Sequence, residues 1–388
     1  MNKKYSLASS SWDEKEISAI NKVIETGNYS MGKFVREFEE KFSEYIGSKF
    51  CVMVNSGSSA NLLSVGSLFY TQSKALKPGD EVIVPAVSWS TSYTPLQQYG
   101  LKLKFVDIDI DTLNYNLDDL SDAVTNKTKL ILIVNILGNP NDFSRIKKII
   151  NGRDIILVED NCESLGAKFN NKMTGTFGKL GTFSFFYSHH MSTMEGGMIC
   201  TDNRELYDIL LSLRAHGWTR NLDDKNLICK KSNNLFNESF RFILPGYNVR
   251  PIEFSGSIGI VQLTKLEGFL EQRRKNYLKF KEVFNQDERF LIQKEIGESS
   301  WFGFSLILRD SKLKRDDFLK KLQEYKIEYR PIVSGNFVKS ESLKFYNYEI
   351  FREMKNAEYL DLNGFFIGNH HYDLSEEFDM LKRAIQSL

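Results

Sequence analysis

Short, almost wholly apolar runs alternate with stretches of helical periodicity over the first part of the chain. Five of these runs predict strands, over residues 50–55, 80–85, 103–108, 129–135 and 154–159, and residues 60–69 predict a helix. Runs without polar alternation are typical of strands covered on both faces, as in a mainly parallel sheet with helices between its strands. Ligands of such sheets bind at the carboxyl ends of the strands. Polar or special residues stand at or near these ends: Asn55, Pro85, Asp160 and Ser184.

The pattern changes after Pro251. A long amphipathic run predicts one helix over residues 253–284, and residues 301–308 and 328–330 read as strands of a smaller α+β unit. We therefore predict an α/β fold with three parts. Residues 1–27 form an N-terminal arm and helix, residues 28–250 a large domain, and residues 251–388 the long helix and a small C-terminal domain.

Composition and charge narrow the class of protein. The 388 residues include 51 Lys and Arg against 50 Asp and Glu, a balance that favours neither nucleic acid nor an anionic membrane. No apolar stretch reaches the length of a membrane span, and no signal peptide is recognisable, so we expect a cytoplasmic protein. The four cysteines have spacings that match no zinc or iron–sulfur pattern, so we expect buried free thiols and no metal site at Cys51, Cys162, Cys200 and Cys229.

Three features could bind a phosphorylated, flat cofactor. The small-residue turn at residues 55–61 (NSGSSAN) would present backbone N–H groups at a helix N-terminus, which suits a phosphate. Taken alone, such a turn is more often a plain helix cap, which Ser and Gly favour. Trp89 could stack on a heterocycle or belong to the core. Asp160 ends a strand, where its carboxylate could pair with a pyridinium nitrogen or cap a helix.

A histidine stands where such a pocket would be expected to hold a lysine. The segment Ser188-His189-His190 precedes Glu195-Gly-Gly, and no lysine occurs between Leu180 and Arg204. Pyridoxal-phosphate enzymes normally hold their cofactor covalently through a lysine. The sequence therefore predicts a cofactor held without a covalent bond.

The order of these motifs resembles that of the sugar aminotransferase family, the fold-type I, aspartate-aminotransferase-like enzymes that act on nucleotide-linked keto-sugars. The resemblance covers nearly the whole chain and is closest to the 3-dehydratase branch, which has histidine at the lysine position. It is carried by residues 85–91 (PAVSWST), 159–164 (EDNCES), 187–190 (YSHH), 214–221 (RAHGWTRN) and 244–251 (LPGYNVRP).

The resemblance implies a role for each candidate site residue. Cofactor phosphate contacts are implied for Gly57, Ser58, Ser184 and, from the second subunit of a homodimer with shared active sites, Asn248. Trp89 would stack on the ring, Asp160 would pair with its nitrogen, and Glu163 would lie near its hydroxyl, where most family members have glutamine. His189 would be the catalytic base, and His216 and Arg250 would contact the substrate or the carboxylate of glutamate.

The same resemblance implies a reaction. Pyridoxamine or pyridoxal phosphate would serve as cofactor and glutamate as co-substrate. The C3 hydroxyl of GDP-4-keto-6-deoxy-D-mannose would be removed to give GDP-4-keto-3,6-dideoxy-D-mannose, a step toward dideoxy sugars such as colitose in O-antigen. Three alternatives stay open: another nucleotide-linked 4-keto-6-deoxy sugar, a non-catalytic cofactor-binding paralogue, and an iron–sulfur-assisted dehydratase, against which the dispersed cysteines argue.

The remaining histidines receive structural interpretations. Alignment of the motif places His189, and not His190, at the family's lysine. For His190 we expect a packing or hydrogen-bonding role, and for the pair His370-His371 a position at the surface.

Overall fold

A computed structural model describes residues 4–284, 287–309 and 314–387. Its centre is an eight-stranded sheet in the order β1-β9-β8-β5-β4-β2-β3-β13, in which β9 runs antiparallel to both its neighbours and the other pairs are parallel. The strands are β1 (Phe50–Val54), β2 (Glu81–Pro85), β3 (Lys102–Val106), β4 (Thr128–Val134), β5 (Ile156–Asp160), β8 (Leu180–Ser184), β9 (Gly197–Thr201) and β13 (Tyr348–Ile350). All five predicted strands are present, and the α/β fold class is confirmed.

The apolar runs have a physical cause in the two covered faces of this sheet. In β2, Val82 and Val84 pack into one core while Ile83 packs into another on the opposite face. Side chains alternate across a strand, so a strand buried on both faces must be apolar throughout. The covering helices are α3 (Gly57–Phe69), α4 (Ser90–Gln98) and α7 (Arg204–Arg214) on one side, and α5 (Leu117–Ala123) and α6 (Phe143–Ile150) on the other.

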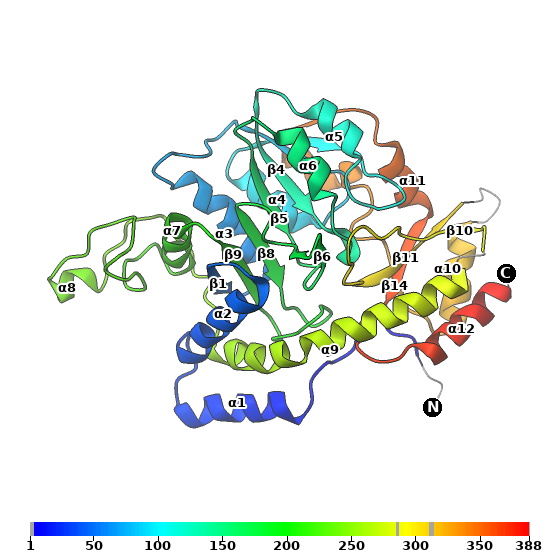
Figure 1. The fold of residues 1–388 in the computed structure, drawn as a ribbon, viewed down its shortest axis with the longest axis horizontal. Coiled ribbons are helices and arrows are strands. Elements are labelled where there is room, and N and C mark those ends of the chain that lie inside the picture. The colour runs from blue at the N-terminus through cyan, green and yellow to red at the C-terminus, as the bar shows by residue number, and fades with distance from the viewer. Residues whose placement is uncertain (1–3, 285–286, 310–313, 388) are drawn as a thin grey trace.

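The helix α9 (Glu253–Phe284) runs from beneath the large sheet to the C-terminal unit, with α1 (Glu14–Thr26) and α2 (Lys33–Ile46) against its first half (Figure 1). It matches the predicted helix over residues 253–284. Asp13 and Glu16 form a capping box that fixes the start of α1. Further along, α9 also packs against α12 (Ser375–Gln386), so it connects the large sheet with the C-terminal unit.

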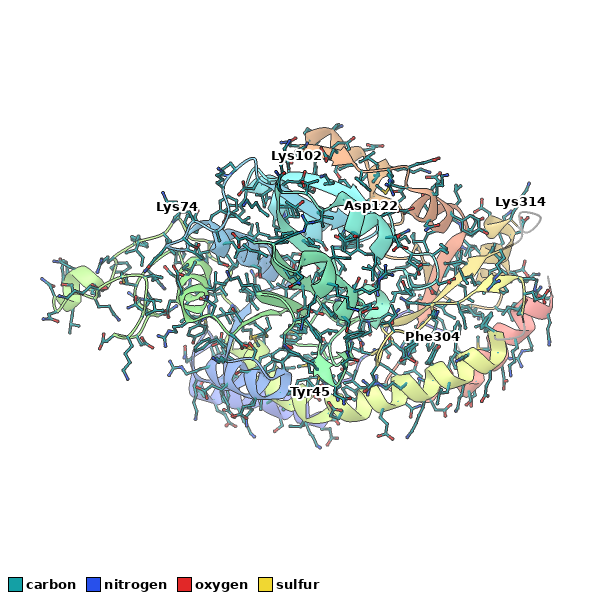
Figure 2. The ribbon with its side chains drawn as sticks, turned by 45° about the horizontal axis from the view of Figure 1, so that its top comes forward. Tyr45, Lys74, Lys102, Asp122, Phe304 and Lys314 are labelled. Atoms are coloured by element: carbon teal, nitrogen blue, oxygen red, sulfur yellow. The ribbon has the colours of Figure 1, made fainter. Side chains whose placement is uncertain are left out.

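The C-terminal unit has its own sheet and core. Its antiparallel strands, in the order β10-β11-β14-β12, are β10 (Phe290–Leu291), β11 (Gly303–Leu308), β14 (Gly364–Gly368) and β12 (Tyr329–Arg330). Its helices are α10 (Arg315–Glu324), α11 (Lys355–Asn363) and α12 (Ser375–Gln386). Phe304 of β11, labelled in Figure 2, lies in this unit. Its ring stacks on Phe280 of α9, with centroids 4.4 Å apart. The strand β13 leaves this unit and joins the large sheet beside β3. The division at residues 27 and 250 stays a prediction.

The remaining elements are short. They are the hairpin strands β6 (Lys168–Phe169) and β7 (Lys172–Met173), the helix α8 (Leu235–Glu238), and the 3-10 turns Ile136–Gly138, Phe337–Lys339 and Glu341–Phe345. The segment that carries α8 projects from the body of the molecule (Figure 1).

The cysteines are free thiols. Cys51 and Cys200 are buried as predicted, in register across β1 and β9. The prediction of burial is wrong for Cys162 and Cys229, which are half-buried because both lie in loops, Cys162 at the wall of the large pocket described next.

Candidate active site

A pocket of about 320 Å³ opens at the carboxyl ends of the large sheet, beside the C-terminal unit. Seven of the predicted site residues line it: Gly57, Ser58, Trp89, Asp160, Glu163, Ser184 and His189. The C-terminal unit contributes Phe302, Arg330, Val333 and Phe366, and the N-terminal arm contributes Leu7 and Ala8. The pocket therefore lies where parallel sheets generally bind their ligands.

Asp160 is a buried carboxyl group at the wall of this pocket. Its Oδ2 accepts hydrogen bonds from Asn61 Nδ2 at 2.8 Å and from Ser92 Oγ at 2.7 Å, and its Oδ1 accepts one from the Cys162 N–H at 3.1 Å. Asn61 is itself oriented by Thr182, whose Oγ1 donates to Asn61 Oδ1 at 2.6 Å. Such donors hold a carboxylate in one orientation, and an N–H of a bound ring could add a further hydrogen bond.

The start of α3 has the features of a phosphate site. Ser56 caps the helix through a hydrogen bond from the Ser59 N–H to its Oγ, and the first turn faces the pocket. A Cβ at Gly57 would lie 2.6 Å from Ser184 Cβ and 2.9 Å from Cys162 Sγ, so only glycine fits there. Close approach of backbone N–H groups and the positive end of the helix dipole both favour an anion. Ser58 Oγ donates to Thr91 Oγ1 at 2.9 Å at the same edge.

His189 lies in the loop between β8 and β9 and is half-buried. Its ring meets Phe302 edge to face, with centroids 5.2 Å apart, and its Nδ1 is buried without a hydrogen-bond partner among the described residues. Burial lowers the pKa of the imidazole to about 4, and the positive charge of Arg273 adds to this effect. The imidazole is therefore neutral at physiological pH, with a nitrogen available to take a proton.

Glu163 is the second titratable group of the pocket. Burial raises the pKa of its carboxyl to about 7. The nearby charge of Asp160 adds to this shift, while a hydrogen bond from the Leu137 N–H to Oε2, at 3.0 Å, opposes it. Leu137 has a φ of 51°, a conformation uncommon outside glycine, and this turns its N–H toward Glu163. A carboxyl that is protonated near neutral pH can donate a hydrogen bond to a ring oxygen.

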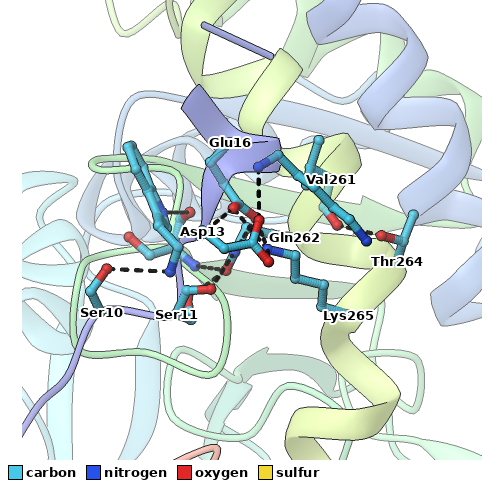
Figure 3. Close-up of polar contacts among 11 residues, drawn as sticks. Ser10, Ser11, Asp13, Glu16, Val261, Gln262, Thr264 and Lys265 are labelled. Atoms are coloured by element: carbon cyan, nitrogen blue, oxygen red, sulfur yellow. Dashed lines mark hydrogen bonds and ion pairs between the residues drawn. The ribbon is translucent and has the colours of Figure 1, made fainter. Parts of the chain in front are cut away.

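The loop that carries His189 is tied to α9 and to the N-terminal arm. Gln262 of α9 accepts at Oε1 from the Ser192 N–H and from Ser11 Oγ, at 3.1 and 2.7 Å, and its Nε2 donates to Glu16 Oε1 at 2.7 Å (Figure 3). Lys265 pairs with the same Glu16 carboxylate (Figure 3). Gln262 and Glu16 are fully buried, so this network holds the loop that carries His189 against α9 and the N-terminal arm.

Of the predictions made for the other histidines, the one for His190 is confirmed and the one for His370 and His371 is wrong. His190 is buried and its Nε2 lies 3.0 Å from the Ser300 carbonyl oxygen, which agrees with a structural role. The surface position predicted for the pair His370-His371 is wrong. His370 is buried because the N-terminal arm covers it, with Ser9 Oγ and the Ser6 carbonyl each 2.8 Å from its ring nitrogens, and His371 is half-buried against Phe269.

Three predicted site residues lie outside the pocket but close to one another. Asn248 pairs with Ala215 in an isolated β-bridge, and Arg250 Nε donates to Asn248 Oδ1 at 3.0 Å. His216 and Arg250 both pack against the Trp218 ring, with His216 5.0 Å and Arg250 5.5 Å from its centroid. The roles assigned to these three residues, like those of the seven in the pocket, stay predictions.

Sequence reasoning missed three polar residues of the site. Asn61 lies one helical turn after Gly57, so helical spacing could have placed it on the pocket side of α3. Ser92 follows Trp89 by three residues at the start of α4, where the same reasoning applies. Arg330 of β12 comes from the C-terminal unit, and no local signal in the sequence connects it with the pocket.

The residues present fit a flat, phosphorylated ring. A buried carboxylate, a glycine cradle at a helix N-terminus, the half-exposed Trp89 and an unpartnered imidazole nitrogen together supply its contacts. Within residues 4–284, 287–309 and 314–387, no group of three or more His, Cys, Asp or Glu side chains is arranged to hold a metal ion. No helix in these same ranges has the length and hydropathy needed to cross a membrane.

Comparison with known proteins gives consistent results. The profile of the DegT/DnrJ/EryC1/StrS aminotransferase family matches residues 10–370. GDP-4-keto-6-deoxy-D-mannose 3-dehydratase of Yersinia pseudotuberculosis is 58% identical over 386 residues, 98% of each chain. A structure of GDP-4-keto-6-deoxymannose-3-dehydratase with a trapped PLP-glutamate geminal diamine has a TM-score of 0.97 and 56% identity, covering 98% of this chain and 99% of that one.

A second solved structure adds a nucleotide sugar. It is a mutant of GDP-4-keto-6-deoxymannose-3-dehydratase with bound GDP-perosamine, with a TM-score of 0.97 and 56% identity over 98% of this chain and all of that one. The family profile covers most of the sequence, and these relatives match it from end to end. This chain therefore belongs to the DegT/DnrJ/EryC1/StrS aminotransferase family.

Proposed function

We propose that this protein is a 3-dehydratase acting on GDP-4-keto-6-deoxy-D-mannose, with pyridoxamine or pyridoxal phosphate as cofactor and glutamate as co-substrate. The observation that carries the proposal is His189, a neutral imidazole with an unpartnered Nδ1, in a pocket whose described lining contains no lysine. Relatives more than half identical over the whole chain have this activity in their names, and one of them was trapped with PLP and glutamate.

The cofactor would be held by noncovalent contacts, without a bond to a lysine. Asp160 would accept a hydrogen bond from the ring nitrogen, Trp89 would cover one face of the ring, and Gly57, Ser58 and Ser184 would bind the phosphate at the start of α3. Protonated Glu163 would donate to the ring oxygen. The chemistry supplied by the cofactor is an amine that can condense with the sugar ketone and a ring that can accept electrons.

His189 moves protons in this proposal. As a neutral base it would take a proton from the cofactor carbon that bears the amine, and as the resulting acid it would give that proton to the departing C3 hydroxyl, which would leave as water. Because burial and Arg273 disfavour the imidazolium, His189 gives up this proton readily. In the net reaction C3 is reduced from a carbinol carbon to a methylene, glutamate is oxidised to 2-oxoglutarate, and ammonia is released.

We also propose a homodimer with shared active sites. His216, Asn248 and Arg250 stand together outside the pocket of their own chain, on the segment that carries α8. That segment exposes large apolar side chains, Leu235 at 83% and Phe236 at 86%, which a monomer would leave in water. A second copy of the chain would bury them and receive Asn248 and Arg250 at its own pocket.

The test is a product analysis. Purified protein is incubated with pyridoxal phosphate, glutamate and a panel of nucleotide-linked 4-keto-6-deoxy sugars, and the products are identified by mass spectrometry. We expect the GDP-mannose derivative to lose one oxygen atom, with one 2-oxoglutarate and one ammonia formed for each sugar. Preference for a different nucleotide or sugar would correct the substrate, and the absence of 2-oxoglutarate and dehydrated sugar with every compound would favour a non-catalytic paralogue.

A further inference from the structure

Arg273 of α9 is a buried cation behind the pocket wall. Its side chain is 5% exposed, and its Nη1 donates to the carbonyl oxygens of Asn369 at 2.9 Å, Phe302 at 3.2 Å and Trp301 at 3.4 Å. Among the described residues no carboxylate lies within 4 Å of the guanidinium, and its Nε is buried without a hydrogen-bond partner. Buried charges are ordinarily paired with an opposite charge, so this cation requires an explanation.

The carbonyl groups that Arg273 binds belong to a segment in contact with the reactive part of the pocket. Residues 299–302 lead into β11, and Trp301 within them has a φ of 47°. Phe302 presents its ring to His189, and the Ser300 carbonyl oxygen binds His190 Nε2. Arg273 therefore holds the backbone that places the neighbours of both histidines.

The same segment also fixes the backbone near Glu163. The Phe302 N–H donates to the Leu137 carbonyl at 3.0 Å, and Ser300 N–H and Ser299 Oγ donate to the Gly138 carbonyl at 3.0 and 2.9 Å. The Leu137 N–H is the group that binds Glu163. Arg273 thus supports the wall that positions His189 and the turn that positions Glu163, while Arg274 Nε donates to the Ser299 carbonyl at 3.2 Å at the start of the same segment.

The charge of Arg273 acts on the histidines as well. Burial lowers the pKa of its own guanidinium only to about 10, so it is a cation at neutral pH. After burial, Arg273 is the largest influence on four histidines, whose pKa values all lie below the ordinary range: His189, His190, His370 and His371. The other charged or titratable groups that line the pocket with His189 are Asp160, Cys162, Glu163, Glu195 and Arg330, and His190 lies beside it in the chain. Arg274 on α9 acts on His190.

We propose that Arg273 is a positioning residue of this active site. It locks residues 299–302 against His189 and His190, and its unpaired charge disfavours the imidazolium form of His189, so that a proton taken up there is readily passed on. The inference rests on the proposed role of His189 as the base. The effect of the charge can be measured on the protein without substrate, whereas the positioning part is measured by the rate.

The experiment titrates histidine side chains by NMR in the protein without cofactor, labelled with ¹⁵N-histidine. The His189 signal is assigned as the one that disappears in His189→Asn. We compare Arg273→Lys, which keeps the positive charge but replaces the planar guanidinium by an ammonium, with Arg273→Gln, which loses the charge. Thermal unfolding of both variants is measured as well. Arg274→Gln serves as the control, because Arg274 lies next on the helix but is paired with Glu298.

We expect Arg273→Gln to raise the pKa of His189 by about one unit, whereas Arg273→Lys and Arg274→Gln leave it low. We expect Arg273→Lys nevertheless to lower kcat about tenfold or more, because an ammonium cannot bind the same carbonyl groups in a fixed plane. An equal rise in Arg273→Lys and Arg273→Gln would overturn the role of the charge, as would an unchanged pKa in both. A normal kcat in Arg273→Lys would overturn the positioning role, and a raised His189 pKa in Arg273→Lys would by itself overturn the role of the charge, even if Arg273→Gln does not fold.

Discussion

The pocket at the strand ends and the projecting segment over residues 215–250 are built in opposite ways. In the pocket, Asp160 receives three hydrogen bonds, Gly57 leaves no space for a side chain, and the His189 loop is tied to α9. The projecting segment has little regular structure and exposes Phe236 to water. The chemistry is thus preorganised within one chain, whereas the predicted phosphate and substrate contacts of His216, Asn248 and Arg250 stand outside the pocket of their own chain.

The largest expected effect belongs to the pocket alone. His189→Asn should lower kcat for both dehydration and the glutamate half-reaction by about 10³-fold, because loss of a general acid and base typically costs 10² to 10⁴ in rate. Fluorescence titration should find cofactor binding retained, since Asp160 and the start of α3 are unchanged. Cofactor that becomes covalently attached in His189→Lys, detected by mass spectrometry after borohydride reduction, would place position 189 at the cofactor aldehyde.

The corresponding His190→Asn variant decides which histidine is the base. His190 contacts the Ser300 carbonyl and should tolerate the change with a far smaller loss of rate. Activity that survives in His189→Asn but is lost in His190→Asn would contradict the assignment.

The second prediction joins the two regions. His189→Asn and Asn248→Asp should each be inactive as homodimers, the latter because a carboxylate would repel the cofactor phosphate. If Asn248 serves the partner's pocket, co-refolded mixtures should regain about a quarter of the wild-type activity, because half of the dimers are mixed and each has one intact site. A mixture that stays inactive would show that every pocket uses its own Asn248, contrary to the proposal.

The third prediction concerns the segment alone. Phe236→Asp should weaken the dimer by about tenfold or more, because it places a charge in the proposed interface. Thermal stability of the monomer should change little, since this ring touches water. Phe345→Asp is the matched control, because Phe345 is 71% exposed on another element. Analytical ultracentrifugation measures the dimer dissociation constant of both variants. Equal values would show that the segment is not part of the interface.

The smallest expected effect is a pH dependence within the pocket. The carboxyl pKa of Glu163 is about 7 in the folded protein and lies near 4.5 in the unfolded chain, so the folded form holds its proton more tightly. Its contribution to stability is full below pH 4.5 and is lost as pH rises through 7. Glu163→Gln, which cannot ionise, should therefore be more stable than wild type above pH 7 by at most about 3 kcal/mol, with the difference vanishing below pH 4.5. Thermal unfolding across this range measures it, and a pH-independent difference would contradict the raised pKa.

Several elements could be predicted from local patterns because their causes are local. The strands β1 to β5 are apolar runs with polar residues at their ends, and the apolar positions of α9 keep helical spacing over the whole of its length. The helix predicted to start at Ala60 starts at Gly57, because the Ser56 side chain caps it. The buried state of His370 could not be read from its neighbours, since the residues that cover it, Ser6 and Ser9, lie at the other end of the chain.

The sequence by itself determined the sheet, the order of its polar strand ends and the replacement of lysine by His189, because strand burial and motif spacing are written within short stretches of chain. Only the tertiary structure decided what surrounds that histidine. Arg273, Gln262 and Phe302 are distant from it in sequence. Phe302 contacts its ring, Gln262 of α9 binds Ser192 in the same loop, and Arg273 of α9 binds the Phe302 carbonyl. Desolvation and charge depend on that packing, so the protonation state of the proposed base is a property of the fold.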